Sequence, residues 1–155
     1  NHSLDQIMQR ALSLIEEKQN YPESLLYVNH DYIFRPKNLF DNLITEQKLN
    51  GYDCTFPGLL DYGHYWSKSD GGDYRQNDSS MKSREQRSPI YKALYGLGCL
   101  SSSWLIRQGK MIDGKIGILP FQDIRFSMRR RESDYALIYS ELKKNESKLN
   151  FSDDR

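Results

Sequence analysis

The sequence has few cysteines, little net charge and no long hydrophobic run, and each shortage excludes a class of protein. Cys54 and Cys99 are too few for a disulfide framework or a thiolate metal site, so we expect two reduced core residues. The 22 basic and 21 acidic side chains nearly cancel, which argues against binding to nucleic acid or to an anionic membrane surface. No apolar run approaches the ~20 residues that span a bilayer. Since the N-terminus also lacks a signal-peptide pattern, we expect a soluble cytoplasmic protein.

Length and composition predict one domain. The 155 residues, 37% of them apolar and 12% aromatic, suffice for one hydrophobic core and are too few for two. We expect this domain to cover residues 1–146 and a polar tail to cover residues 147–155.

Hydrophobic periodicity predicts alternating helices and strands. Ser3 and Gln6 can form a capping box at the start of the first helix. Helices are predicted over 4–19, from Pro36 to Asn50, from the serines at 101–103 to Gly109 and over 132–144, and strands over 25–29, 52–60, 97–100 and 115–121. The strands are apolar without strict alternation, which predicts an α/β fold with a mostly parallel sheet. Residues 61–88 have little periodicity and are predicted to form a long loop or an excursion from the sheet.

Residues 29–35 directly follow the first predicted strand, where open α/β sheets bind ligands. Arg35 can bind a phosphate or carboxylate, or it can tie down a helix end instead. Asn29 offers an amide to a base or a sugar hydroxyl. His30 has no second ligand at helical or hairpin spacing, so a packed or hydrogen-bonded role is favoured over metal binding.

Two further segments are rich in cations. Arg84, Gln86 and Arg87 lie in the polar stretch before Pro89, which is either a solvated loop or one that folds over an anionic ligand. The arginines at 129–131 can neutralise a triphosphate or an acidic sugar, or they can coat the first turn of the last helix. Three cations oppose the dipole at a helix N-terminus, which gives weak support to a ligand or an acidic subunit surface.

These segments together resemble the acylneuraminate cytidylyltransferase family, the CMP-sugar synthetases, in its C-terminal two-thirds. Residues 25–35 resemble the family's strand and Gln-Pro-Thr-Ser-Pro-Leu-Arg turn, with Asn29 at the glutamine and Arg35 at the arginine. The matches run in the family's order from the first predicted helix to residue 143.

Two later segments extend the resemblance. Arg84, Gln86, Pro89 and Tyr91 resemble the family's Arg, Gln, Pro and Tyr, which lead into an Asn-Gly strand. The segment 114–120 is similar to the strand before the family's metal-binding acidic motif.

The resemblance implies a three-layer, nucleotide-diphospho-sugar-transferase-like fold of the Rossmann-like kind, here without its N-terminal strands. It implies a reaction that joins CTP to an acid sugar to give a CMP-sugar, with Mg²⁺ as cofactor. In that reaction Asn29 and Arg35 contact the nucleotide or the sugar, Arg84 and Gln86 contact the acid sugar, and Tyr91 belongs to the same substrate site.

The sequence departs from the family in two places. The family begins with a strand and a basic, glycine-rich loop that hold the CTP phosphates, and we expect this chain to lack both. The family's Asp-Ile-Asp metal motif becomes Asp123-Ile124-Arg125, or residues 128–130 if Asp134 sets the alignment. Asp123 is therefore the remaining metal candidate, and we expect the isolated chain to be inactive.

Two alternatives remain open. The chain can be a noncatalytic binding or oligomerisation module on the same fold, with residues 52–95 presented to another copy in a homodimer. It can also be a related sugar-nucleotide glycosyltransferase with a similar sheet.

Overall fold

The computed structural model describes residues 2–77 and 81–145, so the predicted tail 147–155 lies outside the described residues. The helices are α1 (Leu4–Glu16), α2 (Leu39–Asn50), α3 (Ser103–Arg107) and α4 (Tyr135–Asn145). The strands are β1 (Ser24–Tyr27), β2 (Cys54–Asp61), β3 (Trp66–Lys68), β4 (Tyr74–Gln76), β5 (Ile90–Ala93), β6 (Cys99–Ser102) and β7 (Ile116–Phe121). Single turns of 3₁₀ helix are η1 (Arg84–Gln86), η2 (Tyr95–Leu97), η3 (Ile124–Ser127) and η4 (Glu132–Asp134).

Local signals in the sequence set the limits of the first two helices. The predicted capping box is present in α1, where Ser3 accepts from the Gln6 backbone and Gln6 accepts from the Ser3 backbone. At the end of α2, Gly51 adopts a left-handed conformation with φ 61° and its N–H bonds to Gln47. The prediction that α2 opens at Pro36 was wrong by three residues, because Asn38 is left-handed and the helix begins after it.

The main sheet is mixed rather than mostly parallel. Its strands follow the order β1-β6-β2-β5, and β7 pairs with β2. Among the described strands of this sheet, only the β2–β7 pair is parallel and the other three pairs are antiparallel. The prediction of a mostly parallel sheet was therefore wrong, because strands buried on both faces have the same hydrophobic pattern in either direction. The coarser prediction of an α/β fold is confirmed.

After the arm, the chain runs back along β2 as β5 and β6, and this explains why the sheet has both parallel and antiparallel strands. β5 and β6 both run antiparallel to β2, and their pairing registers with β2 differ by four residues because η2 is inserted between them. β1 pairs antiparallel to β6 and therefore points the same way as β2 and β7. The carboxyl ends of β1, β2 and β7 consequently meet at one edge of the sheet.

Helices cover both faces of the sheet, and each face has its own core. On one face α1 and α3 contribute to a cluster of Met8, Leu12, Cys54, Phe56, Cys99, Leu105, Ile106 and Met111. On the other face α2 contributes to a cluster of Tyr32, Leu39, Leu43, Leu59, Leu94, Leu97 and Leu100. Apolar burial on both faces thus holds β2 and β6 at the centre of the domain.

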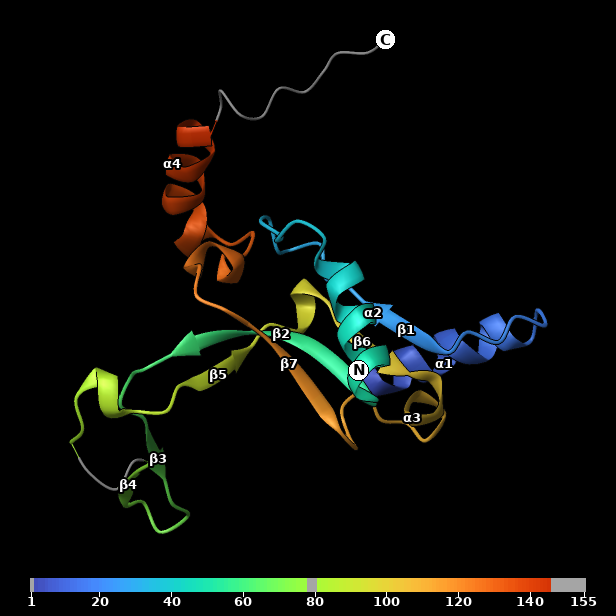
Figure 1. Cartoon of the computed structure of the whole chain (residues 1–155), viewed down its shortest axis with the longest axis horizontal. Coiled ribbons are helices and arrows are strands. Elements are labelled where there is room, and N and C mark those ends of the chain that lie inside the picture. The colour runs from blue at the N-terminus through green and yellow to red at the C-terminus, as the bar shows by residue number, and fades with distance from the viewer. Residues whose placement is uncertain (1, 78–80, 146–155) are drawn as a thin grey trace.

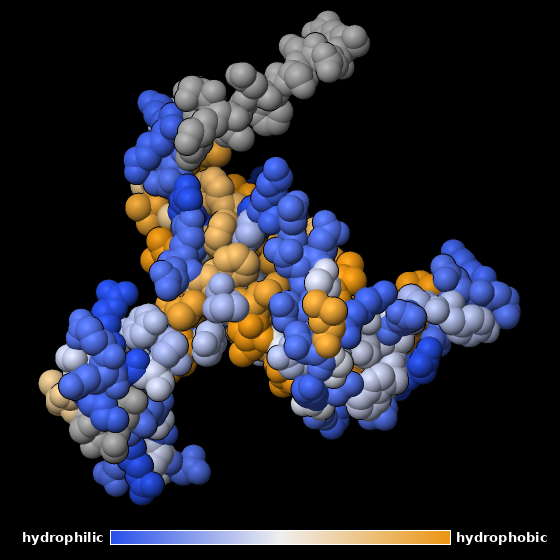
Figure 2. Space-filling model, in the orientation of Figure 1, coloured by the Kyte–Doolittle hydropathy of each residue, from blue (hydrophilic) through white to orange (hydrophobic). Residues whose placement is uncertain are grey.

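Residues 62–77 and 81–89 belong to an arm that stands away from the body. Figure 1 shows the ends of β2 and β5 reaching outward and carrying the β3–β4 hairpin, while α4 projects from a different side. No described residue of the arm belongs to either core cluster. In Figure 2 the arm is largely hydrophilic, and the hydrophobic side chains of this view gather over the centre of the molecule and toward α4. No helix in the described ranges is long and apolar enough to cross a membrane.

Candidate functional site

The edge where β1, β2 and β7 end gathers two groups of polar side chains. The first, here called the β1-end cluster, consists of Asn29, Tyr32, Arg35 and Arg129. The second, here called the arginine pocket, consists of Tyr62, Arg84, Arg87 and Gln122. Carboxyl ends of strands that point the same way are the usual ligand sites of open α/β sheets.

Backbone contacts hold the predicted site residues Asn29 and Arg35 in place. The Asn29 N–H donates to the Gly96 carbonyl at 2.8 Å, and the Asn29 side-chain oxygen accepts from the Asp31 N–H at 2.8 Å. The Arg35 Nη2 donates to the Asn29 carbonyl at 2.7 Å. Arg35 therefore has a structural contact, but it holds the turn after β1 and not the helix end that the structural alternative expected. Its Nε is buried and has no hydrogen-bond partner among the described residues.

Arg129 joins the segment after β7 to the turn after β1. Its Nη2 donates to the Tyr32 hydroxyl at 2.7 Å, and its guanidinium lies 4.9 Å from the centre of the Tyr32 ring. The two residues also form an antiparallel backbone bridge. The Arg129 backbone N–H donates to Asp134, as does the Arg131 side chain. Within the arginine run 129–131, two side chains therefore have structural partners, while Arg130 is exposed.

Hydrogen bonds also fix the protonation state of Asp134. The Arg129 N–H, the Arg131 guanidinium and the Ser133 hydroxyl all donate to its carboxylate, and they lower the Asp134 pKa to about 2. Asp134 is therefore ionised over the physiological range and anchors the turn before α4.

Asp123, the metal candidate, is paired with the cation beside it. The Arg125 Nε donates to both carboxylate oxygens of Asp123 at 3.0 and 2.9 Å, and the Arg125 Nη2 adds a bond of 2.5 Å. The Arg125 guanidinium lowers the pKa of Asp123, and the same contact raises the pKa of Arg125. Among residues 2–77 and 81–145, no three His, Cys, Asp or Glu side chains form a group that could hold a metal ion. A cation at Asp123 would have to displace Arg125.

The arginine pocket consists of two adjoining hollows of about 370 and 360 Å³ at the base of the arm. Tyr62, Arg84 and Gln122 line both hollows. The Arg84 guanidinium lies 5.1 Å from the centre of the Tyr62 ring, which holds it over the aromatic face. Arg87 lines the second hollow, and its Nε and Nη1 are buried without a hydrogen-bond partner among the described residues. Unpaired buried guanidinium donors are costly, and an oxyanion would satisfy them.

Two carboxylates line this pocket, Asp61 in the first hollow and Glu85 in the second, and hydrogen bonds lower the pKa of each. Asp61 accepts from the Tyr65 hydroxyl and from the Gly63 N–H, and these two bonds lower its pKa. Its charge is therefore directed into the turn after β2 rather than toward Arg87.

The structure brings together some of the predicted site residues and separates others. Arg84 lies in the arginine pocket, whereas Gln86 is exposed and lines neither hollow. Tyr91 is 43% exposed on β5 and also lies outside both hollows. Sequence reasoning missed Tyr62 and Gln122, although each directly follows the last residue of a strand, and that position was a usable signal.

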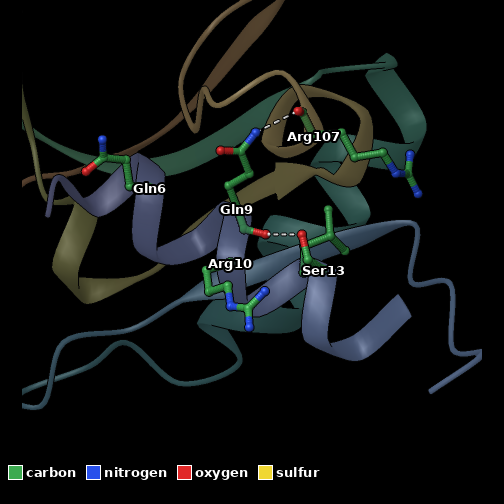
Figure 3. A pocket seen from close by; sticks show the side chains of 6 residues that line it. Gln6, Gln9, Arg10, Ser13 and Arg107 are labelled. Carbon is green, nitrogen blue, oxygen red and sulfur yellow. Dashed lines mark hydrogen bonds between the residues drawn. The ribbon is translucent and has the colours of Figure 1, made fainter. Parts of the chain in front are cut away.

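A third hollow, of about 250 Å³, lies between α1 and α3 and is lined by Gln6, Gln9, Arg10, Leu12, Ser13 and Arg107. Figure 3 shows the Gln9 amide donating to the Arg107 carbonyl and the Ser13 hydroxyl donating to the Gln9 carbonyl, at 2.9 and 3.0 Å. The Arg107 guanidinium is paired with Glu16 at 2.6 Å. Because these groups already have partners, we interpret this hollow as a polar joint between two helices.

Comparison with known protein families finds no family model that matches this chain. A search of curated proteins finds no significant match either.

Proposed function

We propose that this chain is a divergent domain of the acylneuraminate cytidylyltransferase kind, with the Rossmann-like fold of nucleotide-diphospho-sugar transferases, and that its arginine pocket binds an acid sugar. One observation carries the proposal, namely the buried and unpaired donors of Arg87 beside Arg84 in a hollow at the strand ends. A carboxylate accepts such donors well, because guanidinium and carboxylate are planar and of opposite charge.

The arrangement of the edge supports a second contact region for the same ligand or for a nucleotide. The resembling residues Asn29 and Arg35 lie at the end of β1, and Arg84 lies at the base of the arm beyond the end of β2. In the family reaction, the anomeric hydroxyl of the sugar attacks the α-phosphate of CTP and displaces pyrophosphate. Such a reaction depends on holding the two substrates in place and on neutralising phosphate charge.

The magnesium ion implied by the resemblance does not fit the Asp123 site as it stands. Arg125 takes both carboxylate oxygens of Asp123 and also lies 3.6 Å from Glu141, and among the described residues no three His, Cys, Asp or Glu side chains form a group that could hold a metal ion. Mg²⁺ prefers several oxygen ligands in near-octahedral geometry. The proposed function therefore assigns positive charge at this point to Arg125 rather than to a bound cation.

We also propose that the arm mediates a homodimer, which is the second candidate function for residues 52–95. Trp66 is 60% exposed and Tyr74 is 67% exposed. The strand pairing places both on one face of the hairpin, since Tyr74 lies opposite Lys68, two residues from Trp66. Exposed aromatic side chains on a rigid hairpin are typical of an interaction surface.

Calorimetric titration with a panel of acid sugars, and with neutral sugars of matched size, tests the acid-sugar proposal. We expect an acid sugar to bind, and Arg84→Ala and Arg87→Ala each to weaken binding by roughly tenfold or more, because each removes a charge-assisted contact. Arg75→Ala, which removes an exposed arginine of β4, is the matched control and should leave binding unchanged. Equal affinity in all four proteins, or equal binding of neutral sugars, would contradict the proposal.

A further inference from the structure

Two thiols face each other in the core at the centre of the domain. The sulfur of Cys54 on β2 and the sulfur of Cys99 on β6 are 3.7 Å apart, and both residues have no exposed surface. The Ser101 hydroxyl lies 3.7 Å from the first sulfur and 3.8 Å from the second. Each cysteine is free in this structure. The pair is therefore a contact between thiols rather than a bond.

The strand register explains why the sulfurs meet. Cys54 lies opposite Ser101 in the antiparallel β2–β6 pair, and Cys99 is two residues from Ser101 on the same strand. Side chains two residues apart share one face of a sheet, so Cys54 and Cys99 are diagonal neighbours on the face that α1 and α3 cover. Strand pairing in the sheet thus brings together Cys54 and Cys99, which are 45 residues apart in the sequence.

The two thiols differ in acidity. The hydrogen bond from Cys99 lowers the pKa of Cys54, while that same bond and burial raise the pKa of Cys99. Cys54 is therefore the sulfur that ionises first, and Cys99 keeps its proton beside it.

We propose that Cys54 and Cys99 form a reversible disulfide when the protein meets a small peroxide-class oxidant, and that this bond cross-links the first residue of β2 to the first residue of β6 in the core of the body. The sulfurs need to approach from 3.7 Å to about 2.05 Å, which requires side-chain rotation and a shift of the strands. The bond closes the chain segment that carries the β3–β4 hairpin, Arg84 and Arg87. Oxidation therefore fixes the start of β2 to β6, and the arm leaves from the other end of β2.

The chemistry balances with hydrogen peroxide as the oxidant. The Cys54 thiolate attacks one peroxide oxygen and the O–O bond breaks. Hydroxide is the leaving group, and Cys54 becomes a sulfenic acid. The Cys99 sulfur then attacks the Cys54 sulfur, the S–O bond breaks, and a second hydroxide leaves. The two thiol protons convert both hydroxides to water. The two thiols are oxidised by two electrons in total, and the peroxide is reduced by two.

Mass spectrometry of the intact, fully reduced chain before and after hydrogen peroxide treatment tests this inference. We expect a mass loss of about 2 Da, and the loss of both thiols that otherwise react with a thiol reagent in denaturant. A reducing agent should restore the original mass and the two reactive thiols. Peptide mapping without reduction should recover one cross-linked product that contains Cys54 and Cys99. Because this measurement uses the wild-type chain, it does not depend on whether a cysteine variant folds.

Cys54→Ala and Cys99→Ala provide matched controls. Each retains one thiol, so neither should show the mass loss, and neither should give the cross-linked peptide. The inference is overturned if the wild-type chain keeps both thiols after treatment, gains oxygen atoms instead of losing hydrogen, or links only between separate chains.

Discussion

At the scale of single residues, Gly96 lies where the turn after β1 meets η2. A Cβ atom at this position would lie 2.5 Å from the Tyr32 ring and 2.9 Å from the Asn29 Cβ. The Gly96 carbonyl also accepts the Asn29 N–H. Close approach of these segments therefore requires a residue without a side chain.

Gly96→Ala should destabilise the fold by about 1–3 kcal/mol, because the added methyl group forces Tyr32 or the backbone to shift. Urea unfolding of the purified variant measures this change. Gly71→Ala is the matched control, since an added Cβ there would meet only the Ser69 hydroxyl, at 3.9 Å. Equal stability of the two variants would show that the β1-end cluster yields easily to the extra atom.

Asp134 gives a prediction about pH at the same scale. Its pKa falls from 3.8 to about 2 in the folded chain. A lowered carboxyl pKa contributes stability that is fully present above the unfolded value and is lost as pH falls through the folded value. This contribution should thus disappear between about pH 4 and pH 2.

Asp134→Asn should therefore flatten the acid side of the stability profile. The urea midpoint of the wild-type chain should drop further than that of the variant between about pH 5 and pH 2, because the variant has no carboxylate there to protonate. Asp70→Asn, an exposed charge change in the hairpin, serves as the control and should follow the wild-type profile. Parallel profiles for the wild type and Asp134→Asn would contradict the anchoring role of this carboxylate.

At the scale of elements, the β3–β4 hairpin presents an aromatic face that packs against neither hydrophobic core. Lys68 lies over the Tyr74 ring at 5.7 Å, but Trp66 and Tyr74 remain mostly exposed. Neither belongs to a core cluster of the described chain. An aromatic face of this kind is suited to burial against a second copy of the chain.

Replacing Trp66 and Tyr74 with Ala should convert the proposed homodimer to a monomer, since the two side chains provide most of the apolar surface on that face. Sedimentation velocity across a concentration series measures the oligomeric state. Arg75→Ala removes a side chain from the opposite face of the hairpin and should leave the dimer intact. A wild-type chain that stays monomeric at all concentrations would refute the dimer.

At the scale of the whole molecule, the arm and the body have separate roles. The two core clusters lie in the body, whereas the arm contributes Tyr62, Arg84 and Arg87 to the arginine pocket. Asp61 and Ile90 are direct partners across β2 and β5, so a tight turn can close this pair.

Replacing residues 62–89 with Asn-Gly should leave the body folded and abolish acid-sugar binding. We expect the Tm to differ by no more than about 5 °C from that of the variant in which Trp66 and Tyr74 are replaced with Ala. This difference corresponds to about 1–2 kcal/mol in the free energy of unfolding for a domain of this size. Calorimetric scanning and the sugar titration provide the two measurements. Loss of a cooperative transition would mean that the arm stabilises the body, and retained sugar binding would place the ligand elsewhere.

The sequence by itself determined the elements that depend on neighbouring residues. The capping box of Ser3 and Gln6 and the left-handed Gly51 were readable because they involve residues a few positions apart. The four predicted strands were located to within about two residues because apolar runs between polar turns are local patterns, whereas β3, β4 and β5 were not predicted. Arg84 was placed among the candidate site residues by the resemblance, and its role stays a prediction.

Only the tertiary structure decided what depends on how distant segments pair. Strand directions followed from the return of the chain along β2, which an apolar run cannot encode because it looks alike in parallel and antiparallel sheets. The turn at η1 leaves Gln86 outside the pocket that Arg87 lines, although both are polar residues of one short segment. The contact between Cys54 and Cys99 depends on β2–β6 register, since a one-residue slip would move either thiol to the other face.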